Sequence, residues 1–200
     1  CNLSNIALLD NFCWCSPEEP EKIYQLKEAL RACYDLSTKF CTPFISGKDS
    51  MYNDFNGYDK KNRKIKISIS PTLLISSIGI IKDYNDLLSI VPRKFGDLIF
   101  IIGKTDSEMG GSEFEKIFGY ENRSIPQVDK DIAKRNYNNF IKANQKKLIN
   151  SAISIGLGGV AISLAKMSIA SQMGLEVNIS NIQKTNTNIK NTHILFSESQ

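Results

Sequence analysis

The sequence predicts a layered fold that mixes strands and helices, of the α+β or α/β class. Apolar runs typical of strands occur near both ends and in the middle of the chain, and segments with helical periodicity separate them. The chain has 200 residues, of which 42% are hydrophobic and 23% are charged, so it can bury a sizeable core. We therefore expect one or two domains with packed interiors.

The first part of the chain is predicted to be rich in strands. "NIALLDNF" is an apolar strand that runs into Asp10 and Asn11. From Pro20, apolar residues recur at three- and four-residue steps, which predicts a helix that ends before Pro43. "TPFISGKDS" is expected to form a short strand and a glycine turn, and "KIKISIS" and "TLLISSIGII" two further strands.

The second part is predicted to alternate strands with longer helices. "FGDLIFIIG" (95–103) has the continuous apolar character of a buried strand. Residues 129–152 and 156–171 have helical periodicity, and glycines precede the second of these helices. "LEVNI" and "THILFS" are predicted to be strands. We place the domain boundary between residues 88 and 89, in the connection before "FGDLIFIIG".

Composition and charge exclude several classes of partner. No segment approaches the ~20 apolar residues of a membrane span, and the start lacks the features of a signal peptide, so we expect no membrane partner and a cytoplasmic location. The net charge is +4, but no long basic arm is present, so we expect no nucleic-acid partner. The basic run at residues 60–66 is predicted to be a solvated hairpin turn in preference to a phosphate-binding patch.

Cysteine and histidine chemistry is not expected. Five cysteines cluster in the first part of the chain, an odd number that favours reduced thiols over a disulfide framework. Cys13 and Cys15 are not completed to a zinc site by a second pair or a nearby histidine. His193 is the one histidine and lies far along the chain, which argues against a Cys-His catalytic pair.

Three glycine-containing stretches resemble nucleotide-binding motifs but do not match the glycine spacing that those motifs require. "LIFIIGKTD" ends like a P-loop, but Leu98 stands five residues before Gly103, where the motif needs glycine. "TPFISGKDS" fails in the same way, with Thr42 at that position. "GLGGVAISLA" does not match the GxGxxG spacing of dinucleotide-binding turns. The ordinary nucleotide-binding folds are therefore disfavoured.

The stretch "SGKDS" still carries chemistry suited to a polyanion. Gly47 allows close approach of the backbone, Lys48 can neutralise phosphate oxygens, Asp49 can bind magnesium, and the Ser50 hydroxyl can donate a hydrogen bond. The residues alone leave open a plainer alternative, in which this is an exposed turn with a local ion pair.

Seven ordered blocks together are more specific than any single motif. These are "ALLDNFCW", "PFISGKDSMYN", "PTLLISSIGII", "GDLIFIIG", "GGSEF", "AISLAKM" and "ILFSESQ". In this order and spacing, they resemble phosphoribosylformylglycinamidine synthase, the large synthetase of purine biosynthesis. The resemblance extends over essentially all 200 residues.

The resemblance implies a fold and a place within it. Such enzymes contain two tandem copies of a unit shared with aminoimidazole ribonucleotide (AIR) synthetase, in which a strand-rich domain precedes an α/β domain. Residues 1–88 would complete a domain of the first type, and residues 89–200 would form an incomplete domain of the second type. The chain would then correspond to the later part of the second copy and would lack the whole first copy.

The resemblance also implies a reaction, cofactors and partners. Formylglycinamide ribonucleotide, ammonia derived from glutamine and ATP would give formylglycinamidine ribonucleotide, ADP and phosphate, with Mg²⁺ balancing the charge. The ammonia would come from a glutaminase subunit or domain. The isolated 200 residues are expected to be inactive. Two alternatives stay open: a non-catalytic structural pseudo-repeat of that enzyme, and an enzyme similar to AIR synthetase that uses ATP.

By position, the resemblance assigns roles to five residues. Asp10, Gly47 and Lys48 would bind ATP, and Ser50 would contact the substrate. Some family members have asparagine at the position of Lys48 as a magnesium ligand. Since lysine cannot bind magnesium, the metal would fall to Asp49, and Lys48 would contact phosphate directly.

A second departure affects the loop before the last long helix. The family usually has "HDxSDGGL" there, and this chain has "ISIGLGGV". The family's His, Asp, Ser and Asp positions are occupied by Ile153, Ser154, Gly156 and Leu157. Without those carboxylates we expect the pseudo-symmetric site of this copy to be degraded, and Gly158 and Gly159 to serve packing.

The polar residues of "GGSEF" and "SESQ" are open to two interpretations. Ser112, Glu113, Glu198 and Ser199 could bind a ribose phosphate or could cap helices and strands. We favour the capping role.

Overall fold

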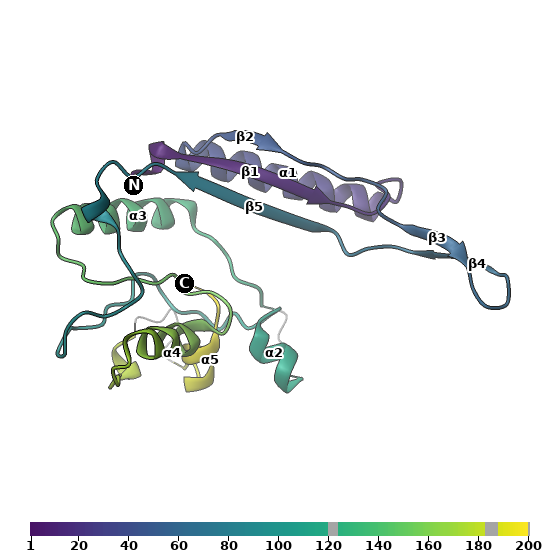
Figure 1. Cartoon of the computed structure of the whole chain (residues 1–200). Coiled ribbons are helices and arrows are strands. Elements are labelled where there is room, and N and C mark those ends of the chain that lie inside the picture. Colours follow the sequence, from purple (N-terminus) through teal and green to yellow (C-terminus); the bar gives the residue numbers. More distant parts are fainter. Residues whose placement is uncertain (120–123, 183–187, 200) are drawn as a thin grey trace. The chain divides into compact units, whose positions relative to one another are not determined.

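The computed structural model describes residues 1–119, 124–182 and 188–199 (Figure 1). It divides into two compact units, Cys1–Lys82 and Asp83–Gln200. This division lies slightly before the boundary predicted between residues 88 and 89. Among the described residues, no helix is long and apolar enough to cross a membrane.

The first unit is built from strands and one long helix. Its elements are the 3-10 helix η1 (Leu3–Asn5), β1 (Ile6–Cys13), α1 (Pro20–Phe40), β2 (Phe44–Gly47), β3 (Phe55–Tyr58), β4 (Lys64–Ile67) and β5 (Thr72–Gly79). One sheet has the order β2-β1-β5, and β3 and β4 form a separate two-stranded sheet. The strands predicted at the start of the chain, around residue 45 and at "TLLISSIGII" are confirmed.

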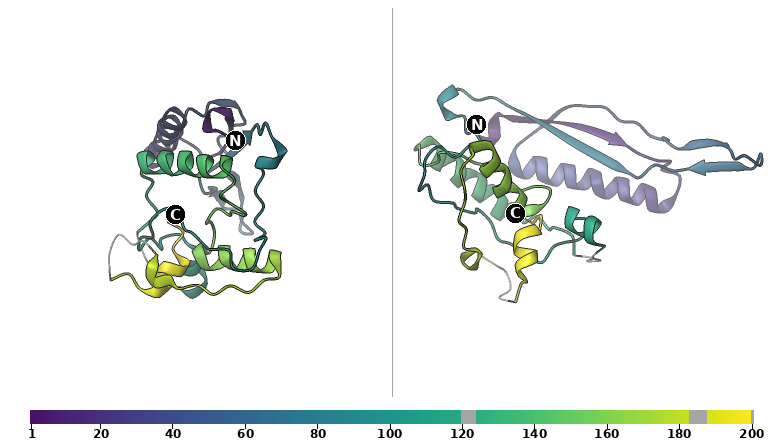
Figure 2. Two further views of the ribbon diagram at one scale, coloured as in Figure 1. Left: turned by 90° about the vertical axis from the view of Figure 1, so that its left-hand side faces the viewer. Right: turned by 60° about the horizontal axis from the view of Figure 1, so that its bottom comes forward.

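Strand β1 lies at the centre of the three-stranded sheet. It pairs in parallel with β2, and helix α1 makes the crossover connection that a parallel pair requires. It pairs antiparallel with β5 along its whole length, from Ile6 opposite Gly79 to Cys13 opposite Thr72. Figure 1 and the right-hand view of Figure 2 show α1 running along these strands.

Helix α1 begins and ends as its sequence predicts. Pro20 occupies the first turn, where its missing N–H costs no hydrogen bond, and Glu21 and Lys39 complement the helix dipole at the two ends. The helix stops at Cys41, whose φ of 57° is left-handed. The predicted end before Pro43 is therefore confirmed.

The core of the first unit lies at the end of β1. Phe12, Trp14 and Cys15 are almost fully buried. Residues of α1, the turn after β2, the segment after β4 and strand β5 pack against them: Leu26, Ala29, Cys33, Met51, Ile69 and Leu73. The Trp14 indole Nε1 donates to the Lys22 carbonyl at 3.2 Å, which fixes the start of α1 to this core.

In the described residues of the second unit, all the regular elements are helices, joined by long irregular segments. Its elements are η2 (Tyr84–Asp86), α2 (Glu113–Phe118), α3 (Lys130–Gln145), α4 (Gly159–Ser171), η3 (Ile179–Asn181) and α5 (Asn191–Phe196). The buried apolar residues are Met109, Val160 and Ile194. The two predicted long helices are confirmed as α3 and α4. The Asp129 carboxylate caps α3 by accepting from the backbone N–H groups of Asp131 and Ile132.

Three predicted strands of the second unit are wrong. Residues 95–103 and "LEVNI" form no strand, and no strand occurs among the described residues after Gly79. Phe95, Leu98 and Phe100 are 80–87% exposed. The physical reason is that a strand is stabilised by a hydrogen-bonded neighbour, and this described part of the chain provides none.

The predicted strand "THILFS" is instead helix α5. Its buried residues are His193 and Ile194, and the C-cap residue Ser197, directly after the helix, is buried as well. A short apolar run cannot be assigned to a strand or a helix by periodicity alone, and here the helix is favoured because one face packs against α4.

Candidate functional site

The candidate site lies where β1 and β2 end side by side. Asp10 is paired with Gly47 in the parallel register of these strands. The Asp10 Oδ1 atom lies 1.8 Å from the point where a Cβ atom on Gly47 would stand. Any residue other than glycine would therefore displace this carboxylate. The structure thus brings together two of the residues that the sequence analysis assigns to ATP.

The turn after β2 stays attached to β1 by its backbone. The Lys48 N–H donates to the Asp10 carbonyl at 3.0 Å, and the Ser50 N–H donates to the Phe12 carbonyl at 2.8 Å. The Trp14 N–H in turn donates to the Ser50 carbonyl at 2.8 Å. The backbone of the stretch "GKDS" is therefore hydrogen-bonded in register with the buried end of β1.

The side chains of the turn make local contacts. Lys48 Nζ donates to Ser50 Oγ at 3.3 Å, which places the cation and the hydroxyl beside each other. Gly47, Lys48 and Asp49 are exposed, and Ser50 is half-buried. A cation, a hydroxyl and exposed backbone at one turn are groups that can bind phosphate oxygens. No hydrogen bond joins the Asp10 and Ser50 side chains within the described residues.

The charge of Asp10 also affects the pKa of a cysteine on helix α1. The pKa of the Cys33 thiol is raised, first by burial and second by the negative charge of Asp10. Cys33 lies on the side of α1 that packs on the core, and Asp10 is two residues from Phe12 on the same face of β1. The carboxylate therefore lies on the side of the sheet that α1 covers. A raised thiol pKa keeps Cys33 protonated and unreactive.

The predicted magnesium ligand has a different partner in this structure. An Asp49 carboxylate oxygen accepts from the Phe12 N–H at 3.4 Å. Within the described ranges, no group of three or more His, Cys, Asp or Glu residues could hold a metal ion. A magnesium ion at Asp49 would take its other ligands from water and phosphate, which is a common arrangement for this metal.

Two residues beyond the turn were missed by the sequence analysis. Asn53 donates through Nδ2 to the Ser50 carbonyl at 2.9 Å, and its N–H donates to the Trp14 carbonyl at 3.1 Å. The Asp54 carboxylate accepts from the Ser16 N–H at 2.9 Å. Both residues tie the end of the turn to the segment directly after β1. An Asn-Asp pair directly after an apolar strand and turn is a capping signal that could have indicated this role.

In the second unit, Glu198 joins the starts of two helices. Its Oε1 atom accepts from the N–H of Glu113 at 3.1 Å, in the first turn of α2, and from the N–H of Gly158 at 2.8 Å, at the start of α4. Ser112 also caps α2 through its hydroxyl. The favoured capping role of Ser112 and Glu198 agrees with these contacts.

Serine hydroxyls pin the segment after α5 to the loop around residue 107. Ser199 Oγ accepts from the Asp106 N–H at 3.2 Å, and Ser197 Oγ donates to the Glu108 carbonyl at 3.1 Å. His193 Nδ1 lies 2.6 Å from Ser107 Oγ. Burial and the nearby Lys190 lower the pKa of His193, so its neutral form is favoured.

Gly159 has the packing role that the sequence analysis assigns to it. Its φ is +68°, and a Cβ atom there would lie 2.6 Å from the Ser197 carbonyl oxygen and 2.8 Å from that of Leu195. Gly158, with φ of +83°, precedes α4 as its left-handed cap residue. Gly159 thus lets the start of α4 approach the backbone of α5 closely.

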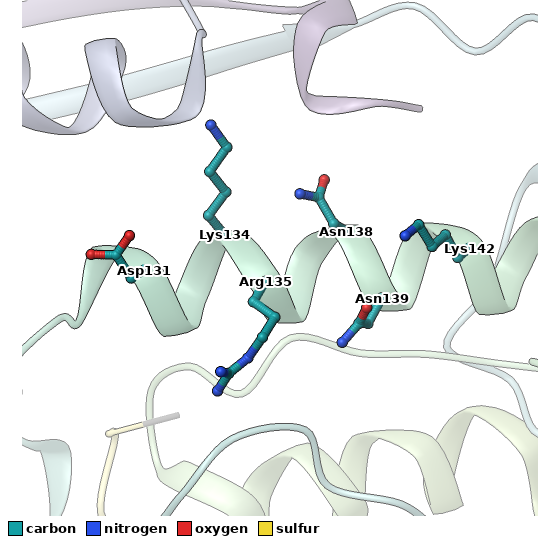
Figure 3. Close-up of a pocket in the computed structure, with 6 residues that line it drawn as sticks. All are labelled: Asp131, Lys134, Arg135, Asn138, Asn139 and Lys142. Carbon is teal, nitrogen blue, oxygen red and sulfur yellow. The ribbon is translucent and has the colours of Figure 1, made fainter.

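A shallow hollow of about 340 Å³ runs along α3 (Figure 3). Its lining comes from this one helix: Asp131, Lys134, Arg135, Asn138, Asn139 and Lys142. Figure 3 shows the Lys134 and Arg135 side chains pointing in different directions, so they do not converge on a common point. This surface is a solvated helix face and offers no enclosed site.

Residues 94–200 match the family model "AIR synthase related protein, C-terminal domain". The chain belongs to the AIR synthase-related family. The match includes "GGSEF", "ISIGLGGV" and "SESQ", the stretches that the Glu198 contacts bring together.

The sequence of the chain is also similar to those of enzymes with an assigned function. The chain is 32% identical over 196 residues to phosphoribosylformylglycinamidine synthase subunit PurL of Methanocaldococcus jannaschii, covering 96% of this chain and 26% of that protein. It is also 32% identical over 194 residues to PurL of Thermococcus sibiricus, covering 97% and 26%. The resemblance found in the seven sequence blocks is confirmed. The chain spans about a quarter of the length of these relatives.

Solved structures of PurL from Thermotoga maritima have a similar fold. The structure of that protein complexed with ATP aligns with a TM-score of 0.62 at 14% identity, covering 100% of this AIR synthase-related chain and 29% of the PurL chain. The structure complexed with FGAR aligns with a TM-score of 0.63 at 17% identity, covering 99% and 31%. These matches confirm a fold of mixed helices and strands. The assignment of residues 1–88 and 89–200 to two domain types stays a prediction.

Proposed function

We propose that this chain forms part of an ATP-dependent amidoligase that makes formylglycinamidine ribonucleotide in purine biosynthesis. The observation that carries the proposal is the similarity to PurL along 96% of the chain, which includes the Gly47 turn. The proposed substrates are formylglycinamide ribonucleotide, ATP and ammonia. Formally, ATP phosphorylates the amide oxygen, and ammonia then displaces phosphate as the new C–N bond forms.

The proposed roles follow the geometry of the turn. Gly47 admits the Asp10 carboxylate and leaves backbone exposed, while Lys48 and Ser50 present a cation and a hydroxyl 3.3 Å apart. We assign Asp10, Gly47 and Lys48 to ATP and Ser50 to the ribonucleotide substrate. Asp49 is proposed to contribute one ligand to Mg²⁺. Fixing these groups against the core end of β1 reduces the reorganisation needed when anionic substrates bind.

The second unit is proposed to have lost its own nucleotide site. The loop "ISIGLGGV" has no carboxylate, and the Glu198 carboxylate already accepts from the N–H groups that begin α2 and α4. A phosphate at either helix start would have to displace this carboxylate and would be repelled by its charge. The same observations favour the second candidate function for this unit, a structural pseudo-repeat that supports the synthetase fold.

The partners and location are also proposals. A glutaminase subunit or domain would supply ammonia, and a first copy of the same synthetase unit would complete the active site. We propose a cytoplasmic location, as for a biosynthetic enzyme with small-molecule substrates. An AIR synthetase-like reaction is the remaining alternative, and the similarity to PurL along nearly the whole chain disfavours it.

The test is single substitution in the intact synthetase with its ammonia source. Asp10→Asn and Ser50→Ala should each lower kcat/KM for ATP-dependent amidation by about tenfold or more, which corresponds to about 1.4 kcal/mol of transition-state stabilisation. Ser76→Ala, on exposed strand β5, is the matched control and should leave kcat/KM within about twofold. Unchanged kinetics in folded Asp10 and Ser50 variants would leave only the structural role.

A further inference from the structure

The hairpin β3–β4 carries the charge excess of the whole chain. Residues 55–67 contain five Lys and Arg residues and one Asp, a net charge of +4, which equals the net charge of all 200 residues. The remainder of the chain is therefore balanced. A compact cationic element on an otherwise neutral chain creates a local field that can recruit an anionic partner.

The turn of the hairpin is organised by one carboxylate. Asp59 accepts from the N–H groups of Lys61 and Arg63 at 2.8 and 2.9 Å, and from Arg63 Nε and Nη2 at 2.7 Å each. The hydrogen bonds from Arg63 lower the pKa of Asp59 most strongly. Asn62 has a φ of 58°, as tight turns require. The predicted hairpin turn is confirmed, and hydrogen bonds to Asp59 close it.

The base of the hairpin is fixed to the rest of the first unit. Lys66 on β4 forms ion pairs with Asp54 at 3.6 Å and with Glu19, just before α1, at 3.4 Å. The Asp54 side chain is only 3% exposed and also accepts from the Ser16 N–H at 2.9 Å. Figure 1 shows the hairpin extending beyond the ends of β1, β5 and α1, within the same unit.

The outer part of the hairpin has exposed cationic side chains that form no ion pair in the described chain. In the described chain, the side chains of Lys60, Lys61 and Lys64 form no ion pair, and all three residues are exposed. The Tyr58 side chain on β3 is 67% exposed and lies directly opposite Lys64 of β4 in the antiparallel register. A two-stranded sheet rarely persists alone in water, so an arm that is pinned at its base and organised at its turn is suited to a partner.

We propose that the β3–β4 hairpin is a docking arm for an acidic protein surface. Lys60, Lys61 and Lys64 would face carboxylates at the rim, and Tyr58, opposite Lys64, would supply the apolar contact that protein interfaces favour. A protein fits better than a nucleic acid because the positive charge is confined to one hairpin, whereas nucleic-acid binding uses an extended basic surface. This proposal does not depend on the amidation reaction.

The test uses the intact protein and two synthetic peptides. One peptide repeats glutamate pairs with single leucines, and the other contains glutamate alone. The wild-type protein should bind the leucine-containing peptide more tightly, with affinity that falls as salt is raised. The triple variant Lys60→Gln, Lys61→Gln and Lys64→Gln should weaken binding of both peptides by about tenfold or more.

Two controls separate an interface from general attraction. Lys27→Gln, Arg31→Gln and Lys82→Gln remove the same charge from exposed sites of the same unit and should change affinity by less than about twofold. Tyr58→Ser should weaken only the leucine-containing peptide. The proposal is overturned if both triple variants lose affinity equally, if the wild-type protein binds neither peptide, or if single-stranded oligouridylate binds more tightly than the peptides.

Discussion

The Asp10 carboxylate occupies the space that a side chain on Gly47 would need: Oδ1 lies 1.8 Å from the Cβ position. The backbone of Gly47 does not have positive φ, so glycine is required here for close approach and not for a left-handed conformation. The obstructing atom is the end of a side chain and can move. A side chain at position 47 should therefore disturb the position of the Asp10 carboxylate more than it disturbs the fold.

Gly47→Ala is expected to displace the Asp10 carboxylate and lower the free energy of unfolding by about 1 kcal/mol. Asp10→Ala should relieve the clash, so the double variant should be more stable than the sum of the single changes predicts, by about 0.5 kcal/mol or more. Denaturant unfolding of the four proteins in this cycle measures the coupling. Additive changes would show that the two residues do not compete for space.

Gly159→Ala is expected to be far more costly. The obstructing atoms are the carbonyl oxygens of Ser197 and Leu195, which cannot rotate away, and the φ of +68° disfavours alanine. We expect a loss of about 2–4 kcal/mol in the free energy of unfolding. Gly156→Ala is the control, since its Cβ would meet open space. Equal melting temperatures for the two variants would argue against close packing of α4 on α5.

Glu198 should show a graded response to substitution. Glu198→Gln keeps an acceptor for the N–H groups of Glu113 and Gly158 but removes its charge, and Glu198→Ala leaves both donors without this partner. We expect losses of about 1 kcal/mol for glutamine and about 2–3 kcal/mol for alanine, measured by denaturant unfolding. Exposed Glu176→Ala should cost less than about 0.5 kcal/mol. Equal stability of the glutamine and alanine variants would contradict the bridging role.

His193 should make stability depend on pH. Its pKa is lowered in the folded state, by burial and then by Lys190, so the unfolded chain takes up a proton at higher pH than the folded chain does. The histidine's contribution is therefore complete above its ordinary pKa of 6.5 and is lost as the pH falls from 6.5 towards the lowered value. Unfolding titrations at a series of pH values should show this fall in the wild type.

His193→Gln removes the titrating group and should flatten the stability profile in that pH range. The comparison uses slopes, so a uniform loss of stability in the variant does not disturb it. Parallel wild-type and variant profiles below pH 6.5 would show that the Ser107–His193 contact does not couple protonation to unfolding.

Sequence patterns predict the helices that are defined by their own capping residues and by an apolar face. Pro20, the apolar spacing that follows it and the stop before Pro43 define α1, and Asp129 marks the start of α3. The residues 95–103 were mistaken for a strand because strand pairing depends on a distant neighbour that periodicity does not reveal. The helix α5 was missed because a run of only three apolar residues, Ile194 to Phe196, fits a strand and a helix equally well.

Part of the candidate site can likewise be predicted from sequence, and part of it depends on the fold. "SGKDS" indicates a phosphate-binding turn by its residue types, and the strand order that places Gly47 against Asp10 requires the fold. The Glu198 bridge joins positions 85 and 40 residues apart, and no local motif predicts which donors a carboxylate will meet at such separations. The capping chemistry was predictable, but its partners were not.

The central claim is that the Gly47 turn binds the phosphates of ATP, and the affinity of the intact protein for a non-hydrolysable ATP analogue tests it most directly. Calorimetry should give a Kd for Lys48→Gln that is about tenfold or more weaker than that of the wild type, because a charge-assisted contact to phosphate is lost. Lys27→Gln, on the exposed side of α1, should bind as the wild type does. A folded Lys48→Gln protein with unchanged affinity would contradict the account.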